Sequence, residues 1–148
     1  LRRIFMLVKQ VSAFVENKTG RLTELADVLA EHHIDISALS LADAAEYGVV
    51  RMIVSDPERA VEALRENGVV CKITTAVAVA MEDIPVGFAG ALHLLTDRGI
   101  EIKYMYACIG HTPGKALMIL SVDDPEIADT MLAETDNGSV NPKEIYRL

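Results

Sequence analysis

The sequence has two cysteines, no tryptophan and few aromatic residues, which make up 5% of the chain. Cys71 and Cys108 stand in apolar, strand-like surroundings, so we expect two buried free thiols rather than the disulfide framework of a small secreted domain. Long apolar runs are also lacking. The run Ile4 to Val8 ends at Lys9 and predicts neither a membrane span nor a secretory signal. These absences favour a cytoplasmic protein.

Positive charge is scarce as well. The chain has 14 Lys and Arg residues against 22 Asp and Glu residues, a formal net charge of −8. This balance argues against nucleic-acid partners, which bind basic surfaces. The four histidines show no zinc-ligand spacing, and the glycines form no phosphate loop. We therefore expect no metal, no cofactor and no nucleic acid. A hydrophobic content of 51% is ample for a packed core.

The first half of the chain alternates between strand and helix periodicity. Apolar residues alternate in β fashion and then recur at the spacing of one buried helix face. The expected strands are Val8–Val15, Ile34–Leu41, Tyr47–Val54 and Val69–Ile73. Helices are expected over Arg21–Glu31 and from Asp56-Pro57, an N-cap followed by proline, to the cap at Asn67-Gly68. The order is βαββαβ.

The second half repeats this order. Ile34-Asp35-Ile36 returns as Ile100-Glu101-Ile102, a shift of 100 − 34 = 66 residues. Asp56-Pro57-Glu58 returns as Asp124-Pro125-Glu126, a shift of 124 − 56 = 68. Agreement at spaced positions indicates an internal duplication. We expect an α+β chain of two ferredoxin-like modules, 1–73 and 74–148, with antiparallel sheets, helices on one face, and 144–148 as the last strand.

One turn of the first half has the features of an anion site. Asn17 to Leu22 joins the first strand to the first helix, and Gly20 tolerates backbone angles closed to other residues. The N–H groups of Gly20, Arg21 and Leu22 lack helical acceptors, and the helix dipole adds positive potential. Such a helix start suits a carboxylate.

The repeated turn resembles that of ACT domains, small modules that sense amino acids. Their pattern is Asn or Asp, then Pro-Gly, an apolar helix, and a motif similar to Gly-Ile-Asn-Ile. The first copy matches it with Asn17-Lys18-Thr19-Gly20-Arg21-Leu22 and His33-Ile34-Asp35-Ile36. The second matches it with Asp83-Ile84-Pro85-Val86-Gly87-Phe88 and Gly99-Ile100-Glu101-Ile102. Thr19 replaces the proline, and Val86 replaces the glycine, with Gly87 as the expected substitute.

The resemblance, closest to free-standing ACT pairs without a catalytic domain, implies a regulatory protein that binds a free amino acid and forms a homodimer. It places the ligand between modules, where the turn of one module meets strand two of a neighbour. Asn17 would bind the carboxylate or the ammonium group, and Asp43 or Asp83 the ammonium group. The full set of expected contacts is Asn17, Thr19, Gly20, Arg21, Leu22, Ser40, Asp43, Asp83, Val86, Gly87, Phe88, Tyr104 and Tyr106.

Other functions remain open for some of these residues. Tyr104 and Tyr106 alternate with Met105, so they face away from the helices and serve either interface packing or ligand contact. Arg21 is either a ligand contact or a solvated arginine. Acylphosphatases share the βαββαβ order and an arginine in this turn, but their glycine-rich cradle is missing here. A ligand-free assembly module is the third hypothesis; no feature of the sequence favours an enzyme.

Overall fold

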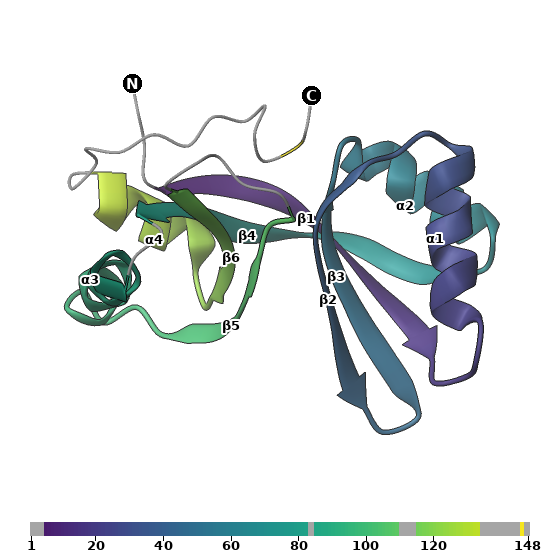
Figure 1. Cartoon of the computed structure of the whole chain (residues 1–148), viewed down its shortest axis with the longest axis horizontal. Helices are drawn as coiled ribbons and strands as arrows, with labels where there is room; N and C mark the ends of the chain where they lie inside the picture. Colours follow the sequence, from purple (N-terminus) through teal and green to yellow (C-terminus); the bar gives the residue numbers. More distant parts are fainter. Residues whose placement is uncertain (1–4, 83–84, 110–114, 134–145, 147–148) are drawn as a thin grey trace. The chain divides into compact units, whose positions relative to one another are not determined.

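The structure is a computed structural model that describes residues 5–82, 85–109, 115–133 and 146. The order of helices and strands follows the prediction (Figure 1), except that the strand expected at Val69–Ile73 and the first strand of the second copy form one continuous strand, Val70–Glu82. The first elements are β1 (Phe5–Glu16), α1 (Arg21–Glu31), β2 (Ile36–Ala44), β3 (Tyr47–Val54) and α2 (Pro57–Glu66). The others are β4 (Val70–Glu82), α3 (Pro85–Thr96), β5 (Ile102–Ala107), β6 (Lys115–Val122) and α4 (Pro125–Ala133).

The chain forms two compact units. One contains Lys9–Thr74 together with Tyr146, and is called the 9–74 unit below. The other contains the described residues of Leu1–Val8 and Thr75–Ile145, and is called the 75–145 unit. β1 and β4 each contribute to both units, because they run across residues 8–9 and 74–75. The sequence boundaries 1–73 and 74–148 remain a prediction about the repeat.

The 9–74 unit is an antiparallel sheet covered by two helices, which confirms the expected α+β class. Its strands lie in the order β2-β3-β1-β4, with Val11 opposite Met52 and Leu39 opposite Met52 on the other side. Alternate residues of β1, namely Val11, Ala13 and Val15, face the helices and are buried with Leu25 and Leu29 of α1. Burial of this apolar surface is the main force that holds the helices on the sheet.

The ends of α2 follow the chemistry that its sequence predicts. The Asp56 carboxylate accepts a hydrogen bond from the Arg59 N–H at 3.2 Å, and Pro57 opens the helix. Gly68 takes the left-handed conformation at the other end, with φ of +79°. In the 75–145 unit the repeated Asp124 accepts a hydrogen bond from the Ile127 N–H at 3.0 Å. The duplication thus preserves the N-cap of this helix.

The core of the 75–145 unit includes the start of β1. Phe5 is 1% exposed and is buried with Val77, Val79 and Leu120, while Leu7 packs against the same cluster. β1 and β4 are hydrogen-bonded neighbours. The sequence places the beginning of the first strand at Val8 and so misses this contribution. The strand expected at 144–148 lies outside the described residues except for Tyr146, whose hydroxyl accepts a hydrogen bond from the Lys9 N–H at 2.9 Å.

Both cysteines are free thiols, but only Cys71 is buried, whereas Cys108 is half-buried. The Cys71 thiol donates to the Val61 carbonyl at 3.7 Å. Burial raises the pKa of Cys71, although the nearby Arg65 opposes this shift. Less of the reactive thiolate is therefore present at a given pH. None of the described helices is long and apolar enough to cross a membrane.

Thiol labelling tests this difference. At mildly alkaline pH we expect Cys108 to react with a thiol reagent on the order of 10–100-fold faster than Cys71. Both thiols should react together in denaturant. Mass spectrometry of labelled peptides identifies the modified residue, and equal rates in the native protein would contradict the buried position of Cys71.

Candidate ligand-binding site

The turn from β1 to α1 has the backbone conformation that its glycine predicts. Gly20 is the N-cap of α1, with φ of +90° and ψ of −10°, and no side chain caps the helix. A Cβ atom at Gly20 would meet nothing within 4 Å. The left-handed backbone, rather than crowding, therefore explains the glycine at this position.

Three amide groups at this turn are available to a ligand. The Arg21 N–H already donates to the Lys18 carbonyl at 3.2 Å, so the predicted donor set is wrong in including Arg21. Within the described residues, the N–H groups of Gly20, Leu22 and Thr23 have no acceptor. They lie at the positive end of the helix dipole, where a carboxylate is stabilised.

Asn17 connects this turn to the β2–β3 hairpin. Its Nδ2 donates to Asp43 Oδ1 at 2.7 Å and to the Ala45 carbonyl at 2.8 Å. Its backbone N–H donates to the Glu46 carbonyl at 3.0 Å. Both side-chain protons are thus used within the protein, and the side-chain oxygen remains an acceptor. Asn17 is therefore suited to a ligand ammonium group rather than to a carboxylate.

A cavity of about 300 Å³ opens beside this turn. Leu22 is 37% exposed and Leu41 is 52% exposed, and together with Val15 they provide apolar surface there. The complete lining is Val15, Glu16, Asn17, Lys18, Thr19, Leu22, Leu41 and Gly48. A Cβ atom at Gly48 would come within 2.9 Å of Leu41 Cδ1. The volume is at the small end of the range for ligand pockets, which suits an amino acid.

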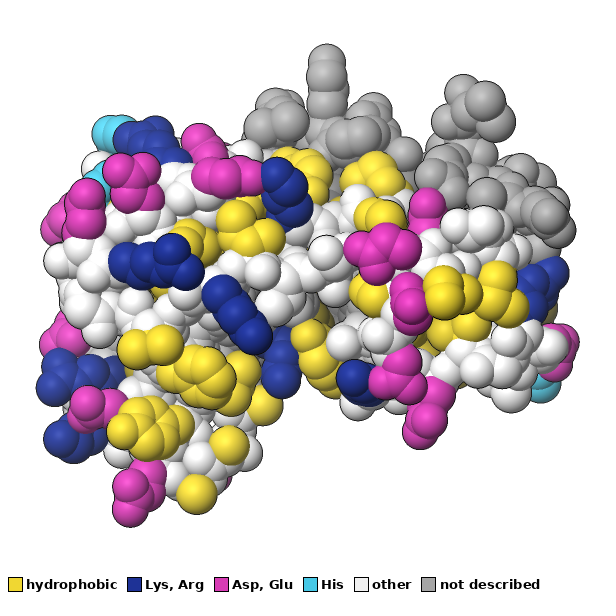
Figure 2. Space-filling model, turned by 180° about the vertical axis from the view of Figure 1, so that it is seen from behind, with side chains coloured by type: hydrophobic (Ala, Val, Ile, Leu, Met, Phe, Trp, Pro, Cys, Tyr) yellow, Lys and Arg dark blue, Asp and Glu magenta, His cyan; other side chains and the backbone are white. Residues whose placement is uncertain are grey.

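Five lining residues are absent from the set expected from the sequence: Val15, Glu16, Lys18, Leu41 and Gly48. A glycine inside a strand pattern is a known sign of close approach by a ligand or backbone, and Gly48 in β3 is such a case. An exposed leucine carries no comparable signal. Figure 2 shows apolar side chains gathered at the end of the molecule that holds the β2–β3 hairpin.

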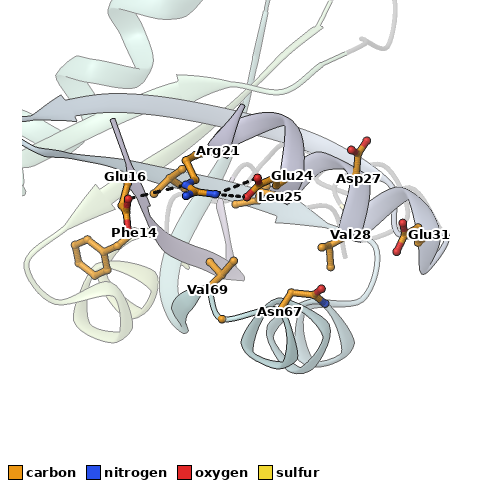
Figure 3. Close-up of a pocket in the computed structure, with 12 residues that line it drawn as sticks. Phe14, Glu16, Arg21, Glu24, Leu25, Asp27, Val28, Glu31, Asn67 and Val69 are labelled. Carbon is orange, nitrogen blue, oxygen red and sulfur yellow. Dashed lines mark hydrogen bonds and ion pairs between the residues drawn. The ribbon is translucent and has the colours of Figure 1, made fainter. Parts of the chain in front are cut away.

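A second cavity of the 9–74 unit is larger, about 410 Å³, and acidic (Figure 3). Glu16, Glu24, Asp27 and Glu31 line it, and Arg21 is its one basic residue. Arg21 Nη1 lies 2.9 Å from Glu24 Oε2, and Arg21 Nε lies 3.9 Å from Glu16 Oε2. The hydrogen bond to Glu24 is the main cause of the raised Arg21 pKa.

The ion pairs of Arg21 favour one of the two cavities over the other as the candidate site for an amino acid. Arg21 is held by carboxylates of its own chain, so it is poorly placed to bind another. The acidic rim would also repel an α-carboxylate. The smaller cavity beside the open amides is therefore the better candidate for a zwitterion. Within the described part of the chain, no three His, Cys, Asp or Glu side chains form a group that could hold a metal ion.

The other expected contacts lie elsewhere. Ser40 is opposite Arg51 on the sheet, on the face away from Leu41, and lines neither cavity. Tyr104 and Tyr106 belong to the 75–145 unit, where their rings stack with centroids 6.4 Å apart. Met105 between them packs in the helix-covered core, so the tyrosines face away from the helices as expected.

The second copy of the turn does not reproduce the first. α3 begins at Pro85, which corresponds to position 85 − 66 = 19, two residues before the start of α1. Val86 and Gly87 are therefore helical, and Gly87 does not adopt the left-handed conformation that we expected of it. Proline favours the first helical position, and valine disfavours positive φ. Phe88 is 41% exposed, and Asp83 lies outside the described residues.

Comparison with known proteins agrees with this architecture. The family model described as an ACT domain pair matches residues 6–148. The crystal structure of protein BT0572 from Bacteroides thetaiotaomicron superposes with a TM-score of 0.86 and 34% identity, covering 97% of this chain and 99% of that one. No curated protein matches.

Two more distant structures share the fold. The ligand-free regulatory subunit of aspartate kinase from Thermus thermophilus has a TM-score of 0.62 and 14% identity, over 87% of this chain and 92% of that one. The regulatory subunit of aspartate kinase from Thermus flavus gives 0.58 and 15%, over 89% and 95%. With a family model that spans nearly the whole sequence, the chain belongs to the ACT domain pair family.

Proposed function

We propose that this chain is a non-catalytic regulatory protein that binds a free amino acid in the cavity beside Gly20. The observation that carries the proposal is the uncapped start of α1. The N–H groups of Leu22 and Thr23 are free there, and Leu22 lines a cavity of amino-acid size. Membership of the ACT domain pair family supports a regulatory role.

Each part of a zwitterion has a matching group at this turn. The α-carboxylate would accept hydrogen bonds from the Leu22 and Thr23 amides, with the Thr19 hydroxyl as a further donor. The ammonium group would bind the Asn17 side-chain oxygen and the Asp43 carboxylate, which are already held together by the 2.7 Å hydrogen bond. The ligand side chain would rest on Leu22 and Leu41. This surface favours an aliphatic amino acid over a charged one.

Binding would regulate by shifting an equilibrium. Leu22 and Leu41 at this cavity remain exposed to solvent, so we propose that a strand of a neighbouring module covers them when ligand is present. A ligand that binds the closed arrangement more tightly shifts the population toward it in proportion to the difference in affinity. The downstream effect would then be a change in assembly or in partner binding.

Isothermal titration with the individual amino acids tests the proposal. We expect heat from one aliphatic amino acid or a few of them, and a rise in melting temperature with ligand concentration. The variant Leu41→Asp, which puts a charge on the apolar surface of the cavity, should abolish the heat, whereas Ile73→Asp at another exposed apolar position should not. No heat and no thermal shift from any amino acid would favour the ligand-free assembly module instead.

A further inference from the structure

Gly48 is a buried glycine at a position where the backbone does not require glycine. It lies in β3, between two neighbouring strands, opposite Val15 of β1 and Asp43 of β2. Its φ is not left-handed, so other residues can adopt the same backbone conformation. Glycine also weakens a strand, because it loses more backbone freedom than other residues and has no side chain to pack. The fold alone therefore gives no reason for a glycine here.

A side chain at position 48 would enter the space between two groups of the candidate site. Its Cβ atom would lie 2.9 Å from Leu41 Cδ1 and 3.5 Å from Asn17 Oδ1. The first distance is too short for two carbon atoms, which pack at about 3.5–4.0 Å. Leu41 is opposite Val50, so it is a diagonal neighbour of Gly48 across the β2–β3 pair. The tip of Leu41 thus occupies the place that a side chain at position 48 would need.

A larger residue at position 48 would change the cavity rather than the sheet. The atom that it would displace is the end of a flexible side chain, and Leu41 is 52% exposed, so the strands themselves need not move. Both Gly48 and Leu41 line the cavity of about 300 Å³. The added methyl group and the displaced leucine tip would therefore both have to be accommodated at the cavity wall.

We propose that Gly48 determines which amino acids this site accepts. Its bare backbone keeps the space between Asn17 Oδ1 and Leu41 open, so the side chain of a ligand whose ammonium group is bound at Asn17 can reach Leu41. Leucine or isoleucine would cover the exposed surface of Leu22 and Leu41, whereas alanine would leave that surface in water. The site would therefore prefer large aliphatic amino acids. This inference rests on the proposed function.

The charges of the lining favour an uncharged ligand side chain. Lys18 Nζ lies 3.2 Å from Glu16 Oε2, so the two charged residues that line this cavity offset each other. The remaining side chains of the lining are apolar or neutral. A charged ligand side chain would lose hydration there without gaining an opposite charge of its own.

Titration calorimetry with glycine, alanine, valine, leucine, isoleucine and phenylalanine tests the inference. We expect the wild type to bind leucine or isoleucine at least about 10-fold more tightly than alanine. Gly48→Ala should weaken leucine binding by at least about 10-fold and alanine binding by less than about 3-fold, because only the larger side chain needs the lost space. Circular dichroism and urea unfolding should show that this variant folds, since alanine is compatible with the backbone at this position.

Two further variants separate cavity size from other effects. Gly90→Ala makes the same chemical change in α3, where the Cβ atom would meet nothing within 4 Å, and should leave every affinity unchanged. Leu41→Ala removes the Cδ1 atom that a side chain at position 48 would meet. It should restore part of the preference for leucine over alanine when combined with Gly48→Ala. Alone, it should raise the affinity for phenylalanine relative to leucine, and this ratio decides the matter if Gly48→Ala does not fold.

The outcomes distinguish this inference from the proposed function. A wild type that binds no amino acid would reject both. A wild type that binds leucine, together with a Gly48→Ala variant that keeps the same preference for leucine over alanine, would reject Gly48 as the determinant of specificity and leave the proposed function standing. Tighter binding of alanine than of leucine by the wild type would also overturn the inference alone.

Discussion

Replacing Phe5 with alanine is expected to destabilise the 75–145 unit by about 3–5 kcal/mol, the usual cost of removing a buried phenylalanine from a core. Phe5 is 1% exposed and is buried among Val77, Val79 and Leu120. Truncation removes apolar contacts and leaves a cavity in that cluster. Apart from Leu7, which packs against this cluster, the core residues closest to Phe5 in the sequence lie in β4, so the effect should appear in residues 72 or more positions along the chain (77 − 5).

Phe14→Ala is the matched control, because Phe14 lies on the same strand but is 49% exposed. It should cost less than about 1 kcal/mol. Urea unfolding gives the overall change, and hydrogen exchange shows where it occurs. Phe5→Ala should reduce protection of β4 and β6, and leave β2 and β3 protected. Equal costs for the two variants, or lost protection in β2 and β3, would contradict the position of Phe5 in the core of the 75–145 unit.

The sequence does not predict that the start of β1 joins the core of the 75–145 unit, and the reason is physical. β3 and α1 begin and end where their periodicity predicts, because each is defined by its own alternation or capping. Phe5 and Leu7 sit in a continuous apolar run, which indicates burial but no particular face. Pairing between strands far apart in the chain depends on the final packing of the sheet, and local pattern does not encode which core a strand end will join.

The candidate site likewise has a part that the sequence predicts and a part that it does not. Gly20 is predictable, since a strand-to-helix turn needs a left-handed residue, and its φ of +90° agrees. Leu41 and Gly48 come from the hairpin that Asn17 brings to the turn, so the turn sequence alone does not reveal them. Two local features also argue against ligand contacts that the sequence predicts. Glu24, three residues after Arg21, forms an ion pair with the Arg21 guanidinium. Pro85 starts α3 too early in the sequence for a second turn like the one at Gly20.

Asn17→Asp should lower the affinity for the ligand by about 10–100-fold. Asn17 Nδ2 donates to Asp43 Oδ1 and to the Ala45 carbonyl. An aspartate at this position has no proton to donate and places a second carboxylate against Asp43. The hairpin should separate from the turn, and Leu41 should leave the cavity. Titration calorimetry with the amino acid that binds the wild type measures the loss.

The charge exchange Asn17→Asp with Asp43→Asn distinguishes this hydrogen bond from a general effect of substitution. The double variant restores one amide donor and one carboxylate across the same 2.7 Å contact, with the directions reversed. It should recover much of the affinity, but not all, because the Ala45 carbonyl still lacks its donor. Unfolding in urea gives a second readout that needs no ligand: the single variant should lose about 1–2 kcal/mol, and the double variant less. If the double variant is as impaired as the sum of its single changes in both measurements, Asn17 and Asp43 are not coupled, and the hairpin is not held to the turn by this pair.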